Sequence, residues 1–375
     1  MTDTALLPQA RKRRRRFSGL SEHQERRFTW IAGVIVLAVM SGWTLSIVDI
    51  YDQKQTGTTS PSVARTVASS LLNQTKPLPF ISDAAIEFLD PIRGESGKLR
   101  AAFVTPGTPM GSRNANPKLV ARYETEGEAP YVSRDLRAPR EPGIYRMAFE
   151  IDRARRAIED LNVITLVPFG EKKSGKIGLY YLGSWPYEQG GKPRLPTYAN
   201  PRGFIEVTRE NQSTNVSEHF RISQFLTKDQ RDVWPKYLLL EPKLLDKLEL
   251  TISNLQAAGY TVEHVHVMSG FRTPRYNHGG GNTSGRANLS RHMYGDGADV
   301  YVDNNKDGQA DDLNRDGRSD VKDAELFASM AEKAEREHPA LVGGIGIYVA
   351  CCGHGPFTHL DVRGYRARWR GTSGG

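Results

Sequence analysis

The stretch SRHMYGDGAD, from Ser290 to Asp299, places a histidine and an aspartate seven residues apart with two glycines between them. Imidazole nitrogens and carboxylate oxygens bind zinc well, and glycines allow the backbone to turn both groups toward one point. His359 offers a third ligand further along the chain. A His/Asp/His set meets the count of a catalytic zinc site, which leaves one position for water. Spacing alone leaves another interpretation open, a glycine-rich loop with a hydrogen-bonded histidine.

The sequence around this stretch predicts an α+β domain with a small antiparallel sheet over residues 217–371. Apolar residues recur at helical spacing in two segments, and short apolar runs predict strands. Pro242 suits a first helical turn and Gly259 suits a helix end. The predicted helices are 241–259 and 323–339. The predicted strands are 261–270, 343–350 and 357–362.

Four motifs occur in order along this domain: SGFRTPRYN (269–277), SRHMYGDGAD (290–299), GGIGIY (343–348) and FTHLDVRGYRARW (357–369). Together they resemble the family of zinc D-alanyl-D-alanine carboxypeptidases and murein endopeptidases. That family shares its fold with the hedgehog and vancomycin-resistance dipeptidase groups. The family pattern S-x-H-x-x-G-x-A-x-D falls on residues 290–299, with Gly297 where the family has alanine.

The resemblance implies a function and a set of site residues. It implies that His292, Asp299 and His359 bind zinc, and that Arg272 and Ser290 bind the substrate. The implied substrate is a peptide of peptidoglycan, cut by a carboxypeptidase or an endopeptidase reaction. Bound zinc would lower the pKa of its water toward about 7 and polarise the scissile carbonyl.

The group that transfers the proton is less clearly marked. In several relatives an acidic residue three positions before the last ligand does this, and here that position is Pro356. Asp361 lies two residues past the last ligand, on the same face of a strand, and is a candidate base or ligand-orienting group. His354 is a candidate proton donor or transition-state stabiliser. The other interpretation of Asp361 is an ion pair with Arg366 or Arg368.

Two further pairs of reactive residues receive no catalytic role. His264 and His266 share one face of the strand predicted at 261–270, where the family needs no ligand, and we interpret them as ordinary strand histidines. Cys351 and Cys352 are the two cysteines of the chain, which excludes a disulfide framework. A strained vicinal disulfide and two buried thiols both remain open for them.

An acidic insert at 303–325 follows Asp299 closely. From Asp312, oxygen side chains occupy loop positions 1, 3, 5, 9 and 12 with Gly317 at position 6, as in a Ca²⁺ loop. A partial copy precedes it, and the tandem resembles dockerin or thrombospondin type 3 calcium repeats. We expect a structural Ca²⁺ here, with a solvated acidic loop as the alternative. The candidate ligands are Asp303, Asn305, Asp307, Asp311, Asp312, Asn314, Asp316, Asp320 and Asp323.

Charge and hydropathy divide the amino-terminal part of the 375-residue chain. Residues 1–27 carry eight basic and three acidic side chains, +5 of the net charge of +8. The remaining +3 is too small for a basic nucleic-acid-binding domain. Residues 28–48 are uncharged and predict a transmembrane helix, with 1–27 as a cytoplasmic tail. A cleaved signal peptide is the alternative.

The segment between the predicted helix and the α+β domain is expected to hold a linker and a second domain. Residues 49–77 are polar and rich in Ser and Thr, which is typical of a linker. Residues 78–205 alternate short apolar runs with turn residues and predict an all-β, sandwich-like domain. The expected protein is a single-pass zinc peptidase of the bacterial inner membrane, with its catalytic domain in the periplasm and no nucleic-acid partner. The rivals are an inactive, zinc-stabilised cell-wall-binding module and a calcium-dependent adhesion protein.

Overall fold

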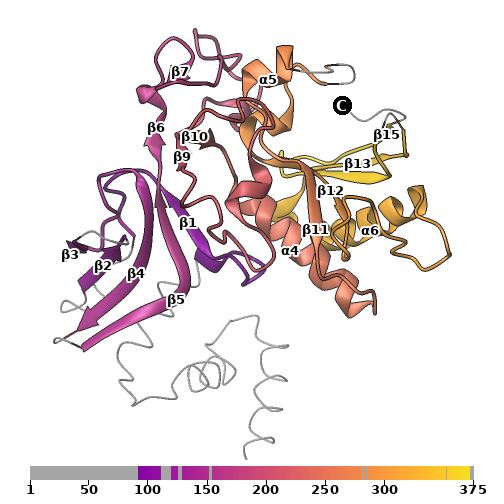
Figure 1. Ribbon diagram of the computed structural model, residues 1–375, viewed down its shortest axis with the longest axis horizontal. Helices are drawn as coiled ribbons and strands as arrows, with labels where there is room; N and C mark the ends of the chain where they lie inside the picture. The colour runs from indigo at the N-terminus through magenta and orange to yellow at the C-terminus, as the bar shows by residue number, and fades with distance from the viewer. Residues whose placement is uncertain are drawn as a thin grey trace, which may run out of the picture. The chain divides into compact units, whose positions relative to one another are not determined.

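The computed structural model describes residues 92–110, 120–125, 129–151, 154–280, 283, 286–351 and 353–371 (Figure 1). These residues form a mixed α+β structure of several small sheets and few helices, which confirms the predicted class. Within them, no helix combines the length and the apolar character needed to cross a membrane. The predicted tail, transmembrane helix and linker (1–27, 28–48 and 49–77) lie outside the described residues.

The first part of the described chain forms a five-stranded sheet in the order β1-β5-β4-β2-β3 (Figure 1). β1 runs parallel to β5, and the other neighbours are antiparallel. Strand β2 shows the alternation that burial of one face requires, with Ala121 and Tyr123 buried. The strands are β1 (Ala101–Val104), β2 (Val120–Glu124), β3 (Tyr131–Ser133), β4 (Gly143–Ile151) and β5 (Ala154–Thr165).

A three-stranded antiparallel sheet combines strands from both sides of the predicted domain boundary. Its order is β10-β9-β6, with β6 at Val167–Pro168, β9 at Gly203–Val207 and β10 at Lys236–Leu238. A short hairpin, β7 (Lys176–Ile177) and β8 (Tyr180–Tyr181), lies between β6 and β9 in the chain. The β10 strand of the predicted carboxyl-terminal domain therefore completes a sheet begun in the preceding one.

A five-stranded sheet carries the four motifs, in the order β11-β12-β14-β13-β15. We expected an antiparallel sheet, but β13 and β15 are parallel. The reason is that β15 follows β14 in the chain and pairs on the far side of β13, which itself runs antiparallel to β14. The strands are β11 (Val265–Ser269), β12 (Gly297–Val302), β13 (Gly344–Tyr348), β14 (Phe357–Asp361) and β15 (Ala367–Gly371).

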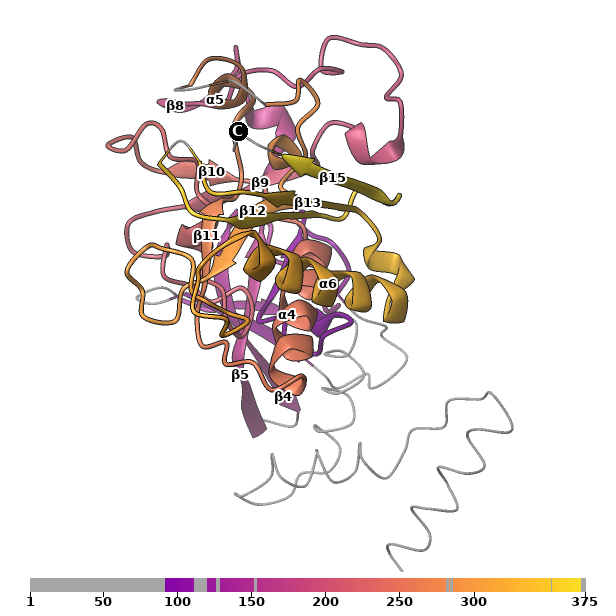
Figure 2. The ribbon, with the colours of Figure 1, turned by 90° about the vertical axis from the view of Figure 1, so that its right-hand side faces the viewer.

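Two helices, α4 (Pro242–Ala257) and α6 (Val321–Glu337), lie side by side against one face of this sheet (Figure 2). Both helices were predicted from their spacing. Thr358 of β14 donates a hydrogen bond from Oγ1 to the carbonyl oxygen of Ala324 in α6, at 2.9 Å. Because side chains alternate along a strand, the next residue, His359, points to the opposite face. A short helix, α5 (Pro274–Gly279), follows the SGFR motif.

One hydrophobic core runs through most of the described chain. The stripe predicted for α4 is buried, and it packs in the same cluster as residues of β6, β9, β12 and β14. Most of the residues around the first sheet pack in a smaller separate cluster, around Tyr123 and Phe149. All described residues belong to one compact unit, Pro79–Gly375.

Candidate metal centre

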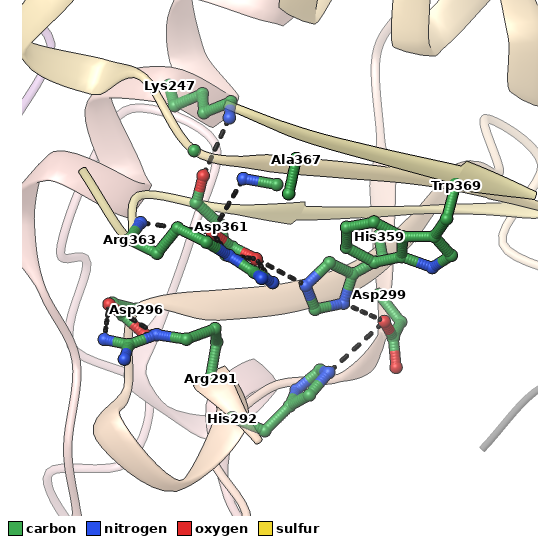
Figure 3. Close-up of polar contacts among 12 residues, drawn as sticks. Lys247, Arg291, His292, Asp296, Asp299, His359, Asp361, Arg363, Ala367 and Trp369 are labelled. Carbon is green, nitrogen blue, oxygen red and sulfur yellow. Dashed lines mark hydrogen bonds and ion pairs between the residues drawn. The ribbon is translucent and has the colours of Figure 1, made fainter. Parts of the chain in front are cut away.

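Three side chains that could hold a metal ion converge on the face of the sheet that points away from α4 and α6 (Figure 3). His292 lies in a short 3-10 helix, Arg291–Tyr294, while Asp299 belongs to β12 and His359 to β14. Asp299 and His359 are direct partners in the antiparallel register of these strands. Pairing of two strands therefore fixes two of the groups, and the glycine-rich turn brings the third.

The donor atoms of the three residues are close together and shielded from water. Asp299 Oδ1 lies 2.7 Å from His359 Nδ1 and 3.3 Å from His292 Nε2. The two imidazole rings are 5.0 Å apart between centroids. All three residues are at most 6% exposed. One metal ion could bind both rings and one carboxylate oxygen at this point.

The atoms of each residue that do not face this point are held by other groups. His292 Nδ1 lies 2.7 Å from the Gly270 carbonyl oxygen, so its Nε2 is left for a metal. Arg272 donates to Asp299 Oδ2 at 2.8 Å, so Oδ1 is the oxygen that faces the two histidines. His359 Nε2 lies 3.1 Å from Asp361, so its Nδ1 is the atom that faces Asp299. Such partners fix the orientation of metal ligands.

Burial and neighbouring charges favour the protonation states that a metal requires at two of the three residues. Burial, together with the nearby Arg272 charge, lowers the pKa of His292 to about 4. Burial opposes ionisation of Asp299, but the two histidines outweigh it and hold the pKa of this carboxyl well below its ordinary value. Hydrogen bonds to Asp299 and Asp361 raise the pKa of His359 against the effect of burial. A metal ion at this site would therefore compete with a proton for His359.

The turn that presents His292 is stiffened on both sides. Gly295 has φ +69°, and a Cβ there would lie 2.4 Å from the backbone of Leu239, so this position requires glycine. Arg291 donates to Asp296 Oδ1 at 2.9 Å across the turn. Trp185, from the segment before the site, donates from its indole nitrogen to the Met293 carbonyl oxygen at 2.9 Å.

Asp361 is a buried carboxylate, and both of its oxygen atoms have hydrogen-bond partners. The Gly344 amide donates to Oδ1 at 2.8 Å, and the Arg363 guanidinium and amide also donate to the carboxylate. We expected Arg366 or Arg368 as the ionic partner if Asp361 were structural; the structure pairs it with Arg363 instead, and both other arginines contact Glu332. His359 and Arg363 outweigh the effect of burial and keep the pKa of Asp361 well below its ordinary value.

Lys247, a residue of α4, connects both helices to β14. Its ammonium group is fully buried and donates to Glu335 at 2.6 Å and to the Asp361 carbonyl oxygen at 2.7 Å. Arg368 also pairs with Glu335. This network places the backbone of β14 against α4 and α6, and so positions the strand that carries His359.

A pocket with a volume of about 150 Å³ is lined by Gly270 and Arg272, the hydrogen-bond partners of His292 and Asp299. Its lining includes Lys228, Arg272, Arg286 and His354, and no acidic side chain among the described residues that line it. Arg272 belongs both to this pocket and to the contact with Asp299. The pocket therefore presents positive charge that is connected to the candidate metal position through Arg272.

The remaining predicted site residues take less direct positions. Ser290 precedes the 3-10 helix, is 7% exposed, and accepts the Met293 amide on its carbonyl oxygen. The Nδ1 atom of His354 lies 2.7 Å from the Gly355 carbonyl oxygen. Cys351 is a free, half-buried cysteine with Sγ 4.0 Å from His354 Nε2. Cys352 lies outside the described residues.

The structure adds Trp369 of β15, a residue that the sequence did not single out. Its ring lies 5.3 Å from the His359 ring, and its indole nitrogen donates to the Tyr348 hydroxyl at 2.8 Å. A Cβ at Gly346 would lie 2.4 Å from the indole, so glycine at this position makes room for it. The signal in the sequence was Gly346 in GGIGIY, because a glycine inside a strand indicates the close approach of another group.

The two halves of the acidic insert repeat one backbone conformation. Positions 4 and 6 have positive φ in both, at Lys306 and Gly308 and again at Arg315 and Gly317. In each half the carboxylate at position 1 accepts the amides of positions 5 and 6. Asp320 caps α6, and Asp323 accepts the amides of Asn314 and Asp320. The tandem pattern noted in the sequence is thus a structural repeat.

Neither a protein-family model, nor a curated protein, nor a solved structure matches this chain. The centre combines two imidazoles and one carboxylate with an adjoining pocket that is lined by cationic side chains.

Proposed function

We propose that the chain is a zinc-dependent peptidase that hydrolyses peptide stems or cross-links of peptidoglycan. The observation that carries the proposal is the buried group of His292, Asp299 and His359, in which every ligand is oriented by a partner of its own. The order of the four motifs, which is that of zinc carboxypeptidases and murein endopeptidases, supplies the substrate class.

The donor set supports zinc. Two imidazoles and one carboxylate match the ligands of hydrolytic zinc sites and leave one position of a tetrahedron open. When bound, zinc would supply a water of lowered pKa and polarise the scissile carbonyl. Calcium and magnesium are disfavoured here because they prefer sites made of oxygen atoms alone.

The residues around the ligands divide the other tasks. Asp361 is saturated by donors and fully buried, so it orients His359 and holds its Nδ1 toward the metal position. Arg272 orients Asp299 from the edge of the pocket. His354 lines the same pocket and is the group proposed to exchange a proton with the substrate. Lys228 and Arg286 add positive charge that suits a carboxylate of a stem peptide.

A zinc-stabilised cell-wall-binding module without activity is the second candidate. The feature that favours it is Pro356, which stands where several relatives carry an acidic residue. The two candidates differ in whether the pocket contains a working proton-transfer group, since both would hold the metal in the same way.

Incubation of the full chain with defined muropeptides, followed by mass spectrometry of the products, tests the proposal. We expect cleavage that stops when a chelator removes the metal and returns when zinc is added. The masses of the fragments identify the bond and distinguish carboxypeptidase from endopeptidase action. Binding of the muropeptides without any product would favour the inactive module.

We also propose that the insert binds structural Ca²⁺. Each half places an oxygen side chain at loop positions 1, 3, 5 and 9, and the two halves share one conformation. Ca²⁺ would bind these oxygen atoms and brace the chain that follows β12.

Addition of Ca²⁺ is expected to raise the melting temperature of the full chain, because a ligand at 100 times its Kd stabilises the folded state by about 2.7 kcal/mol. Asp316→Ala should remove much of this gain. Asp316 also contacts Lys322 at 2.7 Å, so Lys322→Ala is the matched control and should keep it. A parent chain whose melting temperature does not respond to Ca²⁺ would indicate that the insert is a solvated acidic loop.

The proposed location is the bacterial inner membrane, with the carboxyl-terminal part in the periplasm. The uncharged segment 28–48 after an arginine-rich tail supports it. The full-length protein should stay in the membrane fraction after a high-salt wash. Recovery in the soluble fraction with a new amino terminus near residue 50 would indicate a cleaved signal peptide instead.

A further inference from the structure

A second group of metal-binding side chains lies at the far end of the strand pair that carries Asp299. His264 directly precedes β11 and His266 is its second residue, so both side chains project from the same face. The register pairs Val265 with Val302, which brings Asp303 beside His264. The Asp303 amide donates to the His264 carbonyl oxygen at 3.0 Å.

The three side chains are close enough to share one ion. Their ligand atoms all lie within 4.8 Å of one another, and His266 Nδ1 is 3.7 Å from Asp303 Oδ2. Ligands about 2.0–2.2 Å from a tetrahedral metal are separated from each other by roughly 3.4 Å. Small side-chain rotations would therefore complete the site.

The surroundings hold two of these groups in place. The His266 ring stacks on Tyr301 with centroids 4.8 Å apart and an interplanar angle of 15°. Asp303 is 1% exposed, and its carboxylate accepts the amides of Asp307 and Gly308. Both histidines are only half-buried, so an ion could enter from solvent and keep water as its remaining ligand.

We infer that His264, His266 and Asp303 form a second metal site, which takes a divalent transition metal such as Zn²⁺. Two imidazoles in a set of three favour zinc, copper or nickel over calcium and magnesium. This assigns a binding role to the two histidines that we interpreted from the sequence as ordinary strand residues. It also gives Asp303 a partner outside the acidic insert.

The site is separate from the buried centre. The β11–β12 pair joins Ser269 to Asp299 at one end and Val265 to Val302 at the other. Three residue steps along a strand correspond to roughly 10 Å. An ion at the surface site would connect the start of β11 to the start of the insert, without contact to His292 or His359.

Zinc stoichiometry of the untagged full chain in calcium-free buffer tests the inference, measured by equilibrium dialysis and atomic absorption. The parent should bind about two zinc ions per chain, one at each site. His266→Gln and His264→Gln should each bind about one less, while His278→Ala, which changes an exposed histidine away from both sites, should keep two. His292→Ala should lose the buried ion and keep the surface ion.

Two results would overturn the inference. A parent that binds one zinc ion, lost in His292→Ala, would leave the histidine pair without a metal. Full stoichiometry in both His264→Gln and His266→Gln would place the second ion elsewhere. Unchanged melting temperatures of the metal-free variants would show that a lost ion does not reflect a lost fold; we expect this result because both rings are only half-buried.

Discussion

Replacement of His359 by alanine is expected to remove zinc from the buried centre and to end all muropeptide cleavage. The side chain supplies one of three donors, and its Nδ1 lies 2.7 Å from the Asp299 oxygen that would share the ion. Two remaining ligands do not make a stable zinc site, and without the ion no group nearby can lower the pKa of water to the same extent. His292→Ala should give the same result.

The measurement requires that zinc at the surface site is not counted. We would therefore make both substitutions in a chain that also carries His266→Gln, and compare them with His266→Gln alone. Bound metal is read by atomic absorption and cleavage by mass spectrometry. A chain that retains about one zinc ion after His359→Ala, or cleaves stem peptides without His292, would show that SRHMYGDGAD is not part of the metal centre.

Asp361→Asn is expected to weaken zinc binding by about 10–100-fold, the usual effect of losing a carboxylate that orients a ligand. The carboxylate is fully buried and accepts hydrogen bonds from Gly344 and Arg363 in addition to His359. An asparagine amide would place a donor against one of these donors. Cleavage should recover in large part at saturating zinc, because the role proposed for Asp361 is to position His359.

A general base would behave differently at the same position. Zinc would stay bound, and cleavage would fall by about 10²-fold or more at every zinc concentration. Arg363→Lys is the companion variant, since it keeps the charge but loses the planar contact with Asp361. If Asp361 is an orienting group, Arg363→Lys should weaken zinc binding in the same direction by a smaller factor.

Local sequence patterns were sufficient to predict the two long helices that pack behind the sheet of the candidate site. The spacing of Leu244, Leu248, Ile252 and Leu255 predicted α4, and all four side chains are fully buried. The strand β12, by contrast, was missed because the glycines around residue 296 are typical of a loop. Its signal was the run DVYV after them, whose residues Val300 and Val302 are buried. The strand pairing of Asp299 with His359 depends on this missed element.

The partners of individual side chains could not be read from the sequence. Asp361 has three arginines within seven residues, and only the direction of each side chain after β14 selects Arg363. Likewise, Asp303 was assigned to the acidic insert alone, since its position beside His264 follows from the register of β11 and β12. Side-chain direction and strand register are set by packing of the whole fold, which short motifs do not contain.

The shared core bears on how the carboxyl-terminal part of the chain could move between genes. Strand β10 completes its sheet with β9 and β6, and Trp185 holds the turn that presents His292. An exchange of coding sequence at residue 217, where the predicted carboxyl-terminal domain begins, would leave behind β6, β9 and Trp185. The inherited piece would carry every candidate metal ligand and still expose apolar surface where β9 had been. The unit that recombination can transfer intact therefore begins upstream of β6, well before the first of the four motifs.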